Sequence, residues 1–288
     1  MNAAPKLADS LELGPVHITV TDLDRSAGFY QDAIGLQVRE RSDGEASLGA
    51  GGRELLHLVE DRDARPAGRH AGLYHFALLH PSREELARAT ARLVATRTPI
   101  AGASDHGISE AIYLPDPDGN GIELAADRSR ERGGDLSDPT TIGPQPLDLE
   151  ALLATVAGEE PQRHADPALG VGHLHLHVGD VDRGLGFYRD LIGFEAKTLF
   201  PSAAFVSVGG YHHHLAFNTW RGEGVPPAPE GTVGLRHWTV MLDAPDLAAV
   251  EGRLADAGIG TEARDVGVLV RDPWSNALVL AERRGQPA

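Results

Sequence analysis

A short segment of this chain occurs twice, and this duplication constrains the fold more than any other feature of the sequence. The letters GFYQDAIGL at residues 28–36 recur as GFYRDLIGF at residues 186–194, which lie 158 positions later. The same spacing relates His17 to His175. A constant spacing over such a stretch indicates that the second half of the chain is a copy of the first.

Each half is predicted to contain two copies of one small unit, which is a strand, a helix and three further strands. The pattern of apolar residues and turn formers places the strands and helices of the first half at 14–20, 25–34, 36–41, 45–48, 54–59, 73–79, 83–95 and within 106–123. Residues 235–238 and 272–276 echo residues 73–76 and 116–120. The chain is therefore predicted to be an α+β protein of four βαβββ modules, paired into two cup-shaped, barrel-like domains.

The domain boundaries follow from this repeat. Residues 1–127 are predicted to hold the N-terminal pair of modules, and residues 171–288 the C-terminal pair. Residues 128–170 are charged and rich in Pro and Gly, and are predicted to be a linker with one short helix over 149–156.

The helix ends and helix faces are predicted from local signals. Asp24 or Ser26 is expected to cap the first helix, and Gly35 to end it. The helical spacing over 83–95 predicts one apolar face, formed by Leu86, Ala89, Leu93 and Val94.

Composition excludes several classes of protein. The net charge is −16 without a basic block, which argues against nucleic acid as a partner, because phosphate binding needs clustered Lys and Arg. The absence of Cys excludes disulfides, thiolate metal sites and a cysteine nucleophile. No apolar run approaches the roughly 20 residues of a membrane span, so no membrane partner and a cytoplasmic location are expected. The unusual count is that of His, of which there are 14.

Three residues at equivalent positions of the first two modules form the candidate metal site. His17 and His75 lie on first strands, and Glu123 stands between Ile122 and Leu124 on a last strand. Two imidazoles and one carboxylate on one face leave open positions on a metal ion, which is the pattern of non-haem Fe(II) sites. A solvated Glu on an edge strand is the simpler interpretation of Glu123 taken alone.

The chain resembles the vicinal oxygen chelate superfamily, which includes glyoxalases, bleomycin resistance proteins and extradiol dioxygenases. The resemblance is carried by the repeated segment, by residues 72–76, and by Asp-Pro-Asp-Gly-Asn-Gly-Ile-Glu-Leu at 116–124, and it is closest to catechol 2,3-dioxygenase-like two-domain proteins. It implies paired βαβββ modules, a divalent metal at the centre of a cup, and a substrate that chelates through two neighbouring oxygens. The expected function is therefore an extradiol ring-cleavage dioxygenase of aromatic compound catabolism, with Fe(II), or alternatively Mn(II), as cofactor.

The chain departs from this family at one position. Well-studied two-domain extradiol dioxygenases carry the metal in the C-terminal pair, whereas the matching carboxylate position of the fourth module is Val279 here. We therefore expect the metal in the N-terminal half. The C-terminal histidines offer two readings. One is a second site for Zn(II) or Ni(II) on His175, His213 and His237, and the other is a polar histidine network.

The proton donor and acceptor for ring opening are expected near the metal. His106 is the first candidate because imidazole titrates near neutral pH, and Tyr113 is the second. A small aromatic diol and O2 are the predicted partners, and a homo-oligomer is left open. Two alternatives remain, which are a metal-dependent isomerase or lyase of the glyoxalase kind, and a drug-binding protein of the same fold. His57, where the isomerase would want a carboxylate, weakens the first alternative.

Overall fold

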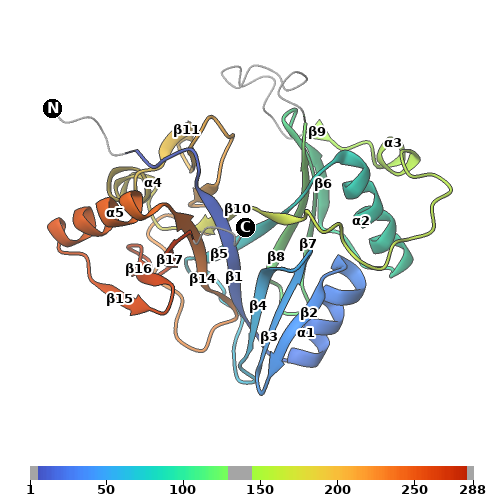
Figure 1. Cartoon of the computed structure of the whole chain (residues 1–288), viewed down its shortest axis with the longest axis horizontal. Helices are drawn as coiled ribbons and strands as arrows, with labels where there is room; N and C mark the ends of the chain where they lie inside the picture. Colours follow the sequence, from blue (N-terminus) through green and yellow to red (C-terminus); the bar gives the residue numbers. More distant parts are fainter. Residues whose placement is uncertain (1–5, 129–144, 284–288) are drawn as a thin grey trace. The chain divides into compact units, whose positions relative to one another are not determined.

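The computed structural model describes residues 6–128 and 145–283 of the chain, as helices and strands joined by short turns (Figure 1). The strands are β1 (Glu12–Val20), β2 (Gln37–Ser42), β3 (Glu45–Ala50), β4 (Arg53–Glu60), β5 (Gly72–His80), β6 (Gly102–Asp105), β7 (Ser109–Pro115), β8 (Gly121–Asp127), β9 (Gln145–Pro146), β10 (Gly170–His177), β11 (Glu195–Phe200), β12 (Ala203–Ser207), β13 (Leu215–Asn218), β14 (Gly234–Leu242), β15 (Thr261–Arg264), β16 (Gly267–Arg271) and β17 (Ala277–Glu282). The helices are α1 (Leu23–Phe29), α2 (Arg83–Ala95), α3 (Leu149–Ala154), α4 (Val181–Leu185) and α5 (Ala244–Asp256), with π-helical turns η1 (Tyr30–Ile34) and η2 (Gly186–Ile192).

The described residues divide into two compact units, whose boundary falls within strands. One unit takes the described residues of Met1–His17, Ala67–Tyr74 and His173–Ala288, and the other those of Ile18–Pro66 and His75–Gly172. The domain boundaries predicted at residues 127 and 171 stay a prediction. Most of the first part of the predicted linker, residues 129–144, lies outside the described residues, and α3 occupies the place of its predicted helix.

Each unit contains open sheets, which fit the predicted cup shape but do not close into the barrel-like domains that were also predicted. In the unit that holds the C-terminal modules, the strand orders are β15-β16-β17-β14-β1 and β11-β12-β13-β10. In the other unit they are β1-β4-β3-β2 and β5-β8-β7-β6-β9. Strand β1 is named in both because the boundary between the units falls inside it. Each module repeats the order of a strand, a helix and three strands, so the predicted α+β class with four βαβββ modules is confirmed.

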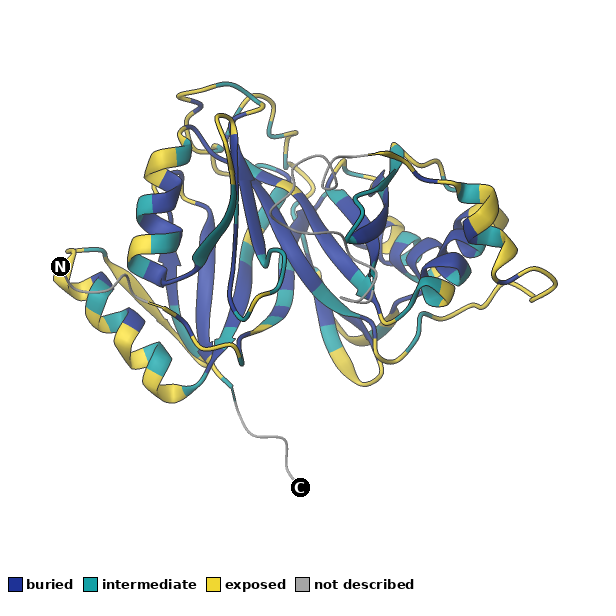
Figure 2. Ribbon diagram, turned by 90° about the horizontal axis from the view of Figure 1, so that it is seen from above, coloured by how far each residue is buried: buried dark blue, intermediate teal, exposed yellow. Residues whose placement is uncertain are grey.

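Helices cover one face of each sheet and bury their apolar side. Helix α1 packs on β3 and β4, and α2 packs on β8, η1 and α3. Figure 2 shows the strands mostly buried, whereas helices carry exposed residues along one side. Leu86, Ala89 and Leu93 form the buried face of α2 as predicted. Val94 is 64% exposed, so its predicted place on the buried face was wrong. It follows Leu93 directly, and consecutive residues of a helix point in different directions.

The first helix begins and ends at the duplicated residues. Its cap is Asp22, whose side chain accepts a hydrogen bond from the Arg25 amide at 2.9 Å, and not Asp24 or Ser26. Gly35 ends η1 as predicted, with φ 85° in the left-handed region. A side chain at Gly35 would place its Cβ 2.6 Å from Arg92 Cζ, so both the backbone and the packing require glycine there.

Two short arms dock onto helix ends by the same hydrogen bond. The Ala165 amide donates to the Gly35 carbonyl at 2.9 Å, and the Leu7 amide donates to the Gly193 carbonyl at 3.0 Å. Both pairs obey the 158-residue spacing, but each arm meets the helix end of the other half of the sequence. The duplication is therefore reciprocal in its contacts as well as repeated in its sequence.

Candidate functional site

A buried imidazole and a buried carboxylate meet at the centre of the second module. His75 Nε2 lies 3.0 Å from Glu123 Oε2, and the two residues are 6% and 3% exposed. Strand register explains the meeting: β5 and β8 run parallel with Ala77 opposite Glu123, and His75 shares the face of Ala77. Glu123 is therefore not the solvated edge carboxylate of the simpler interpretation.

The two predicted proton-transfer residues are joined to each other and lie beside this pair. Tyr113 stands directly opposite Glu123 in the antiparallel pairing of β7 and β8, so both side chains share one face. The Tyr113 ring centroid lies 5.6 Å from that of His75. His106 Nε2 lies 2.8 Å from the Tyr113 hydroxyl, and both residues are half-buried. Four predicted residues therefore form one contiguous group within this unit.

His17, the third predicted ligand, lies on β1 in the stretch that belongs to the other unit. Its ring stacks on His237 with centroids 3.9 Å apart. Its part in the metal site stays a prediction.

His57 occupies the position where a glyoxalase-type enzyme would want a carboxylate. Its Nδ1 lies 2.9 Å from Glu54 Oε1, and its Nε2 lies 3.2 Å from Glu45 Oε2. The hydrogen bond with Glu54 raises the pKa of His57 above its ordinary value. The raised pKa makes this imidazole easier to protonate than an ordinary one.

The predicted second site has its histidines in three different contacts. His175 Nε2 lies 2.8 Å from the Asn218 amide nitrogen, His213 Nδ1 lies 2.8 Å from His212 Nδ1, and His237 stacks on His17. Residues 212–214 lie in the loop before β13, which begins only at Leu215.

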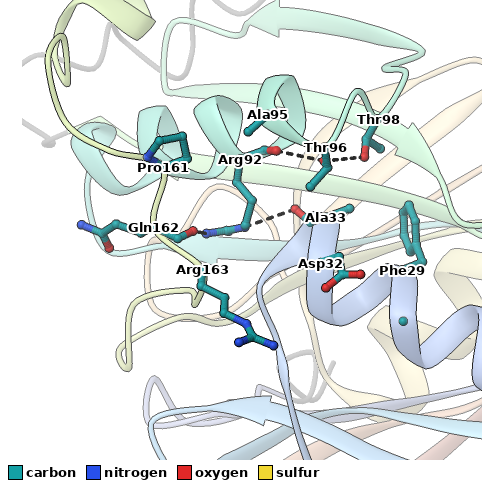
Figure 3. Close-up of a pocket in the computed structure, with 11 residues that line it drawn as sticks. Phe29, Asp32, Ala33, Arg92, Ala95, Thr96, Thr98, Pro161, Gln162 and Arg163 are labelled. Atoms are coloured by element: carbon teal, nitrogen blue, oxygen red, sulfur yellow. Dashed lines mark hydrogen bonds between the residues drawn. The ribbon is translucent and has the colours of Figure 1, made fainter.

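A shallow cavity of about 550 Å³ lies apart from these residues, between η1, the end of α2 and residues 161–163 (Figure 3). None of the predicted site residues lines it. Its buried cation, Arg92, donates to the carbonyls of Ala33, Ile34 and Gln162 at 3.2, 2.7 and 3.1 Å. Burial lowers the pKa of Arg92 to about 10. The guanidinium caps a helix end, and that structural role accounts for it.

A family model and a known protein both match this chain, and both agree with the resemblance expected from the sequence. The model of the family described as Glyoxalase/Bleomycin resistance protein/Dioxygenase superfamily matches residues 12–124 and 170–278. A catechol-2,3-dioxygenase of Bacillus subtilis (strain 168) is 39% identical over an alignment of 282 positions, which covers 94% of this chain and 97% of that protein. The predicted resemblance to catechol 2,3-dioxygenase-like oxidoreductases is thereby confirmed.

Two solved structures share the fold at low sequence identity. Glyoxalase I of Zea mays has a TM-score of 0.59 at 18% identity, with 95% of this chain and 92% of that chain covered. The cppA protein of Streptococcus pneumoniae TIGR4 has a TM-score of 0.58 at 15% identity, with 94% and 99% covered. These likenesses support the two-domain fold alone.

No helix among the described residues is long and apolar enough to cross a membrane.

Proposed function

The chain belongs to the Glyoxalase/Bleomycin resistance protein/Dioxygenase superfamily, and from this premise we propose that it is a metal-dependent extradiol ring-cleavage dioxygenase. Its substrates would be a catechol-type aromatic diol and O2, in cytoplasmic catabolism of aromatic compounds. The observation that carries the proposal is the buried contact of His75 Nε2 with Glu123 Oε2 at 3.0 Å. The 39% identity to a catechol-2,3-dioxygenase supports the choice of reaction.

The donor set fits a divalent metal. Ligand nitrogens and oxygens at about 2.0–2.2 Å from an ion, set at a right angle, are about 2.8–3.1 Å apart. The His75–Glu123 separation lies in that range. His75 and Glu123, with His17 as the proposed third ligand, would hold Fe(II), with Mn(II) as the alternative. Such an ion would lower the pKa of the bound diol and hold it against O2.

His106 and Tyr113 are proposed to donate and accept the protons that ring opening requires. Tyr113 lies across the strand pair from Glu123 and its ring contacts that of His75, which supports a place for its hydroxyl beside a chelated diol. A proton taken from a diol hydroxyl can pass from Tyr113 Oη to His106 Nε2 over their 2.8 Å contact. In the overall reaction one C–C bond beside the diol breaks and both atoms of O2 enter the product, so no external reductant is consumed.

Metal content tests the ligand assignment. We would purify the wild type, Glu123→Gln, His75→Gln and His17→Gln without oxygen and measure bound metals by elemental analysis. Glu54→Gln serves as the matched control, because it also removes a carboxylate that contacts a histidine. About one iron or manganese per chain in the wild type and control, lost in the three ligand variants, is expected. Retention of metal by Glu123→Gln would overturn the assignment, and retention by His17→Gln would remove His17 alone.

Oxygen uptake tests the reaction. The metal-loaded wild type is expected to consume one O2 for each catechol lost in a panel of substituted catechols. Turnover of a small-molecule substrate without O2, with the same loss in Glu123→Gln, would favour the glyoxalase-type alternative. Unchanged ligand affinity in Glu123→Gln with no turnover in either protein would favour the binding-protein alternative.

A further inference from the structure

Four imidazoles gather in the unit that holds the C-terminal modules. His212, His213 and His214 lie in the loop between β12 and β13, and His173 lies on β10. The His173 and His213 ring centroids are 4.1 Å apart. The dioxygenase reaction proposed above gives these four histidines no role.

The loop brings two neighbouring histidines to one point. Gly209 and Gly210 have φ values of 62° and 71°, and this consecutive left-handed backbone turns the chain just before the histidines. As a result His212 Nδ1 and His213 Nδ1 lie 2.8 Å apart, although strand alternation would have set them on opposite faces. The two ring nitrogens therefore face each other.

The separation of these nitrogens matches a metal chelate. Imidazole nitrogens at about 2.0–2.1 Å from an ion, at a right angle to each other, are about 2.8–3.0 Å apart. We propose that His212 and His213 chelate one Cu(II), Ni(II) or Zn(II) ion through their Nδ1 atoms. Imidazole suits these ions, and Cu(II) and Ni(II) accept the right-angled arrangement of nitrogen ligands.

The surrounding side chains are compatible with a bound cation. His214 Nδ1 lies 2.7 Å from Ser207 Oγ. Lys197 is the nearby cation, and its ammonium group pairs with Glu195 at 2.7 Å. His173 contributes a ring against the face of His213.

The site expected from the sequence paired His213 with His175, whereas the proposed site pairs it with His212. The contacts of Asn218 explain this difference. The Trp220 amide donates to Asn218 Oδ1 at 3.0 Å, and a backbone N–H can only donate, so the orientation of the Asn218 amide group is fixed. Asn218 Nδ2 must then donate to His175 Nε2 at 2.8 Å. That nitrogen of His175 is engaged with an amide proton, whereas His212 and His213 already present their nitrogens to each other.

Copper titration followed by electron paramagnetic resonance tests this site. The parent is Glu123→Gln, which removes the other proposed metal site, and it is compared with the same protein carrying His212→Asn and His213→Asn. The control carries His164→Asn, because His164 is an exposed histidine outside the cluster. One equivalent of Cu(II) with coupling to imidazole nitrogen is expected in the parent and control, and its loss is expected in the double variant.

Two results would overturn the site. One is a nitrogen-coupled copper signal of equal size in the double variant, and the other is no such signal in the parent. Thermal melting of each variant, and the two single substitutions, separate loss of ligands from loss of fold. Because the titration uses only Cu(II) and a protein without Glu123, its outcome is independent of the proposed dioxygenase function.

Discussion

The hydroxyl of Tyr30 donates a hydrogen bond to Asp116 Oδ2 at 3.0 Å, with both side chains buried. The second half of the chain repeats this contact between Tyr188 and Asp272 at 2.9 Å. Asp116 also accepts hydrogen bonds from two amides of its own turn and from the side chain of Asn120, so four donors hold this carboxylate. Two of the sequence motifs that mark the family thus meet as one structural element that joins a helix to a turn.

Removing this hydroxyl should destabilise the protein. Tyr30→Phe leaves a buried carboxylate one donor short, which costs about 1–3 kcal/mol of unfolding free energy. Tyr188→Phe should cost a similar amount. Urea denaturation of both variants checks the values, and a loss below about 0.5 kcal/mol in both would show that the contact contributes little.

Arg92→Met should destabilise the protein more than Arg253→Met. Arg92 donates to three carbonyls and is buried, whereas the half-buried Arg253 donates to Leu191 and Ile192 at 2.7 and 2.8 Å. Charge-assisted hydrogen bonds contribute about 1.5–3 kcal/mol each at most, and they leave unpaired carbonyls when removed. Urea denaturation measures the order, and equal losses would contradict it. Arg92→Lys should recover only part of the loss, because an ammonium group cannot reproduce the planar fork.

His80 should make the protein sensitive to acid. It is buried, neither ring nitrogen has a hydrogen-bond partner among the described residues, and burial lowers its pKa to about 3. The unfolded chain binds a proton at its ordinary value of about 6.5, so this residue removes stability as the pH falls from 6.5 towards 3. Between pH 7 and 5 the loss should be about 2 kcal/mol.

His80→Leu should flatten that pH dependence. Unfolding free energies from urea melts at pH 7 and pH 5 give the slope for the wild type and the variant. His164→Leu, which removes an exposed histidine, should leave the slope unchanged. Equal slopes in wild type and His80→Leu would show that His80 is not kept neutral by the fold.

His57 should titrate in the opposite sense. Its pKa is raised, first by the hydrogen bond with Glu54 and further by Glu45, so the folded state favours the imidazolium. The stability that it contributes is complete below about pH 6.5 and is lost as the pH rises through the raised value. NMR titration of the ring protons should give a pKa above 6.5 in the wild type and a lower one in Glu54→Gln. A value unchanged by that substitution would exclude Glu54 as the cause.

His106→Gln and Tyr113→Phe should lower turnover without loss of metal. General acid–base groups contribute about 10²–10⁴-fold to rate, so decreases in kcat of that order are expected for His106→Gln. Tyr113→Phe keeps the ring beside His75 but removes the hydroxyl that contacts His106. Oxygen uptake normalised to bound metal is the measurement. Full activity in both variants would assign the proton transfers to other groups.

Local signals predicted much of the fold. Helix α2 was predicted over 83–95 and is found at Arg83–Ala95, because Ser82 caps it and its apolar spacing is regular. The first helix was predicted without its π-helical turn, since the extra residue in that turn leaves no mark in apolar spacing. Its cap was placed too late because Asp22, Asp24 and Ser26 are all good capping residues, and only the backbone at Asp22 is extended.

The candidate site was predictable where it depends on equivalent positions of repeated modules. His75 and Glu123 follow from their places on a first and a last strand, and parallel register brings them to 3.0 Å. The contact between His106 and Tyr113 depends on how the loop after β6 folds back, which the sequence does not specify. The meeting of His212 with His213 depends on two left-handed glycines, and a strand pattern cannot reveal it.

The exchanged arms have a consequence for how the chain can be divided. The residues that close the helix end at Gly35 come from just before the third module, and those that close Gly193 come from just before the first. A cut between the second module and Ala165 would therefore leave each arm on one fragment and its helix end on the other. Each fragment would then depend on the other to close its first helix.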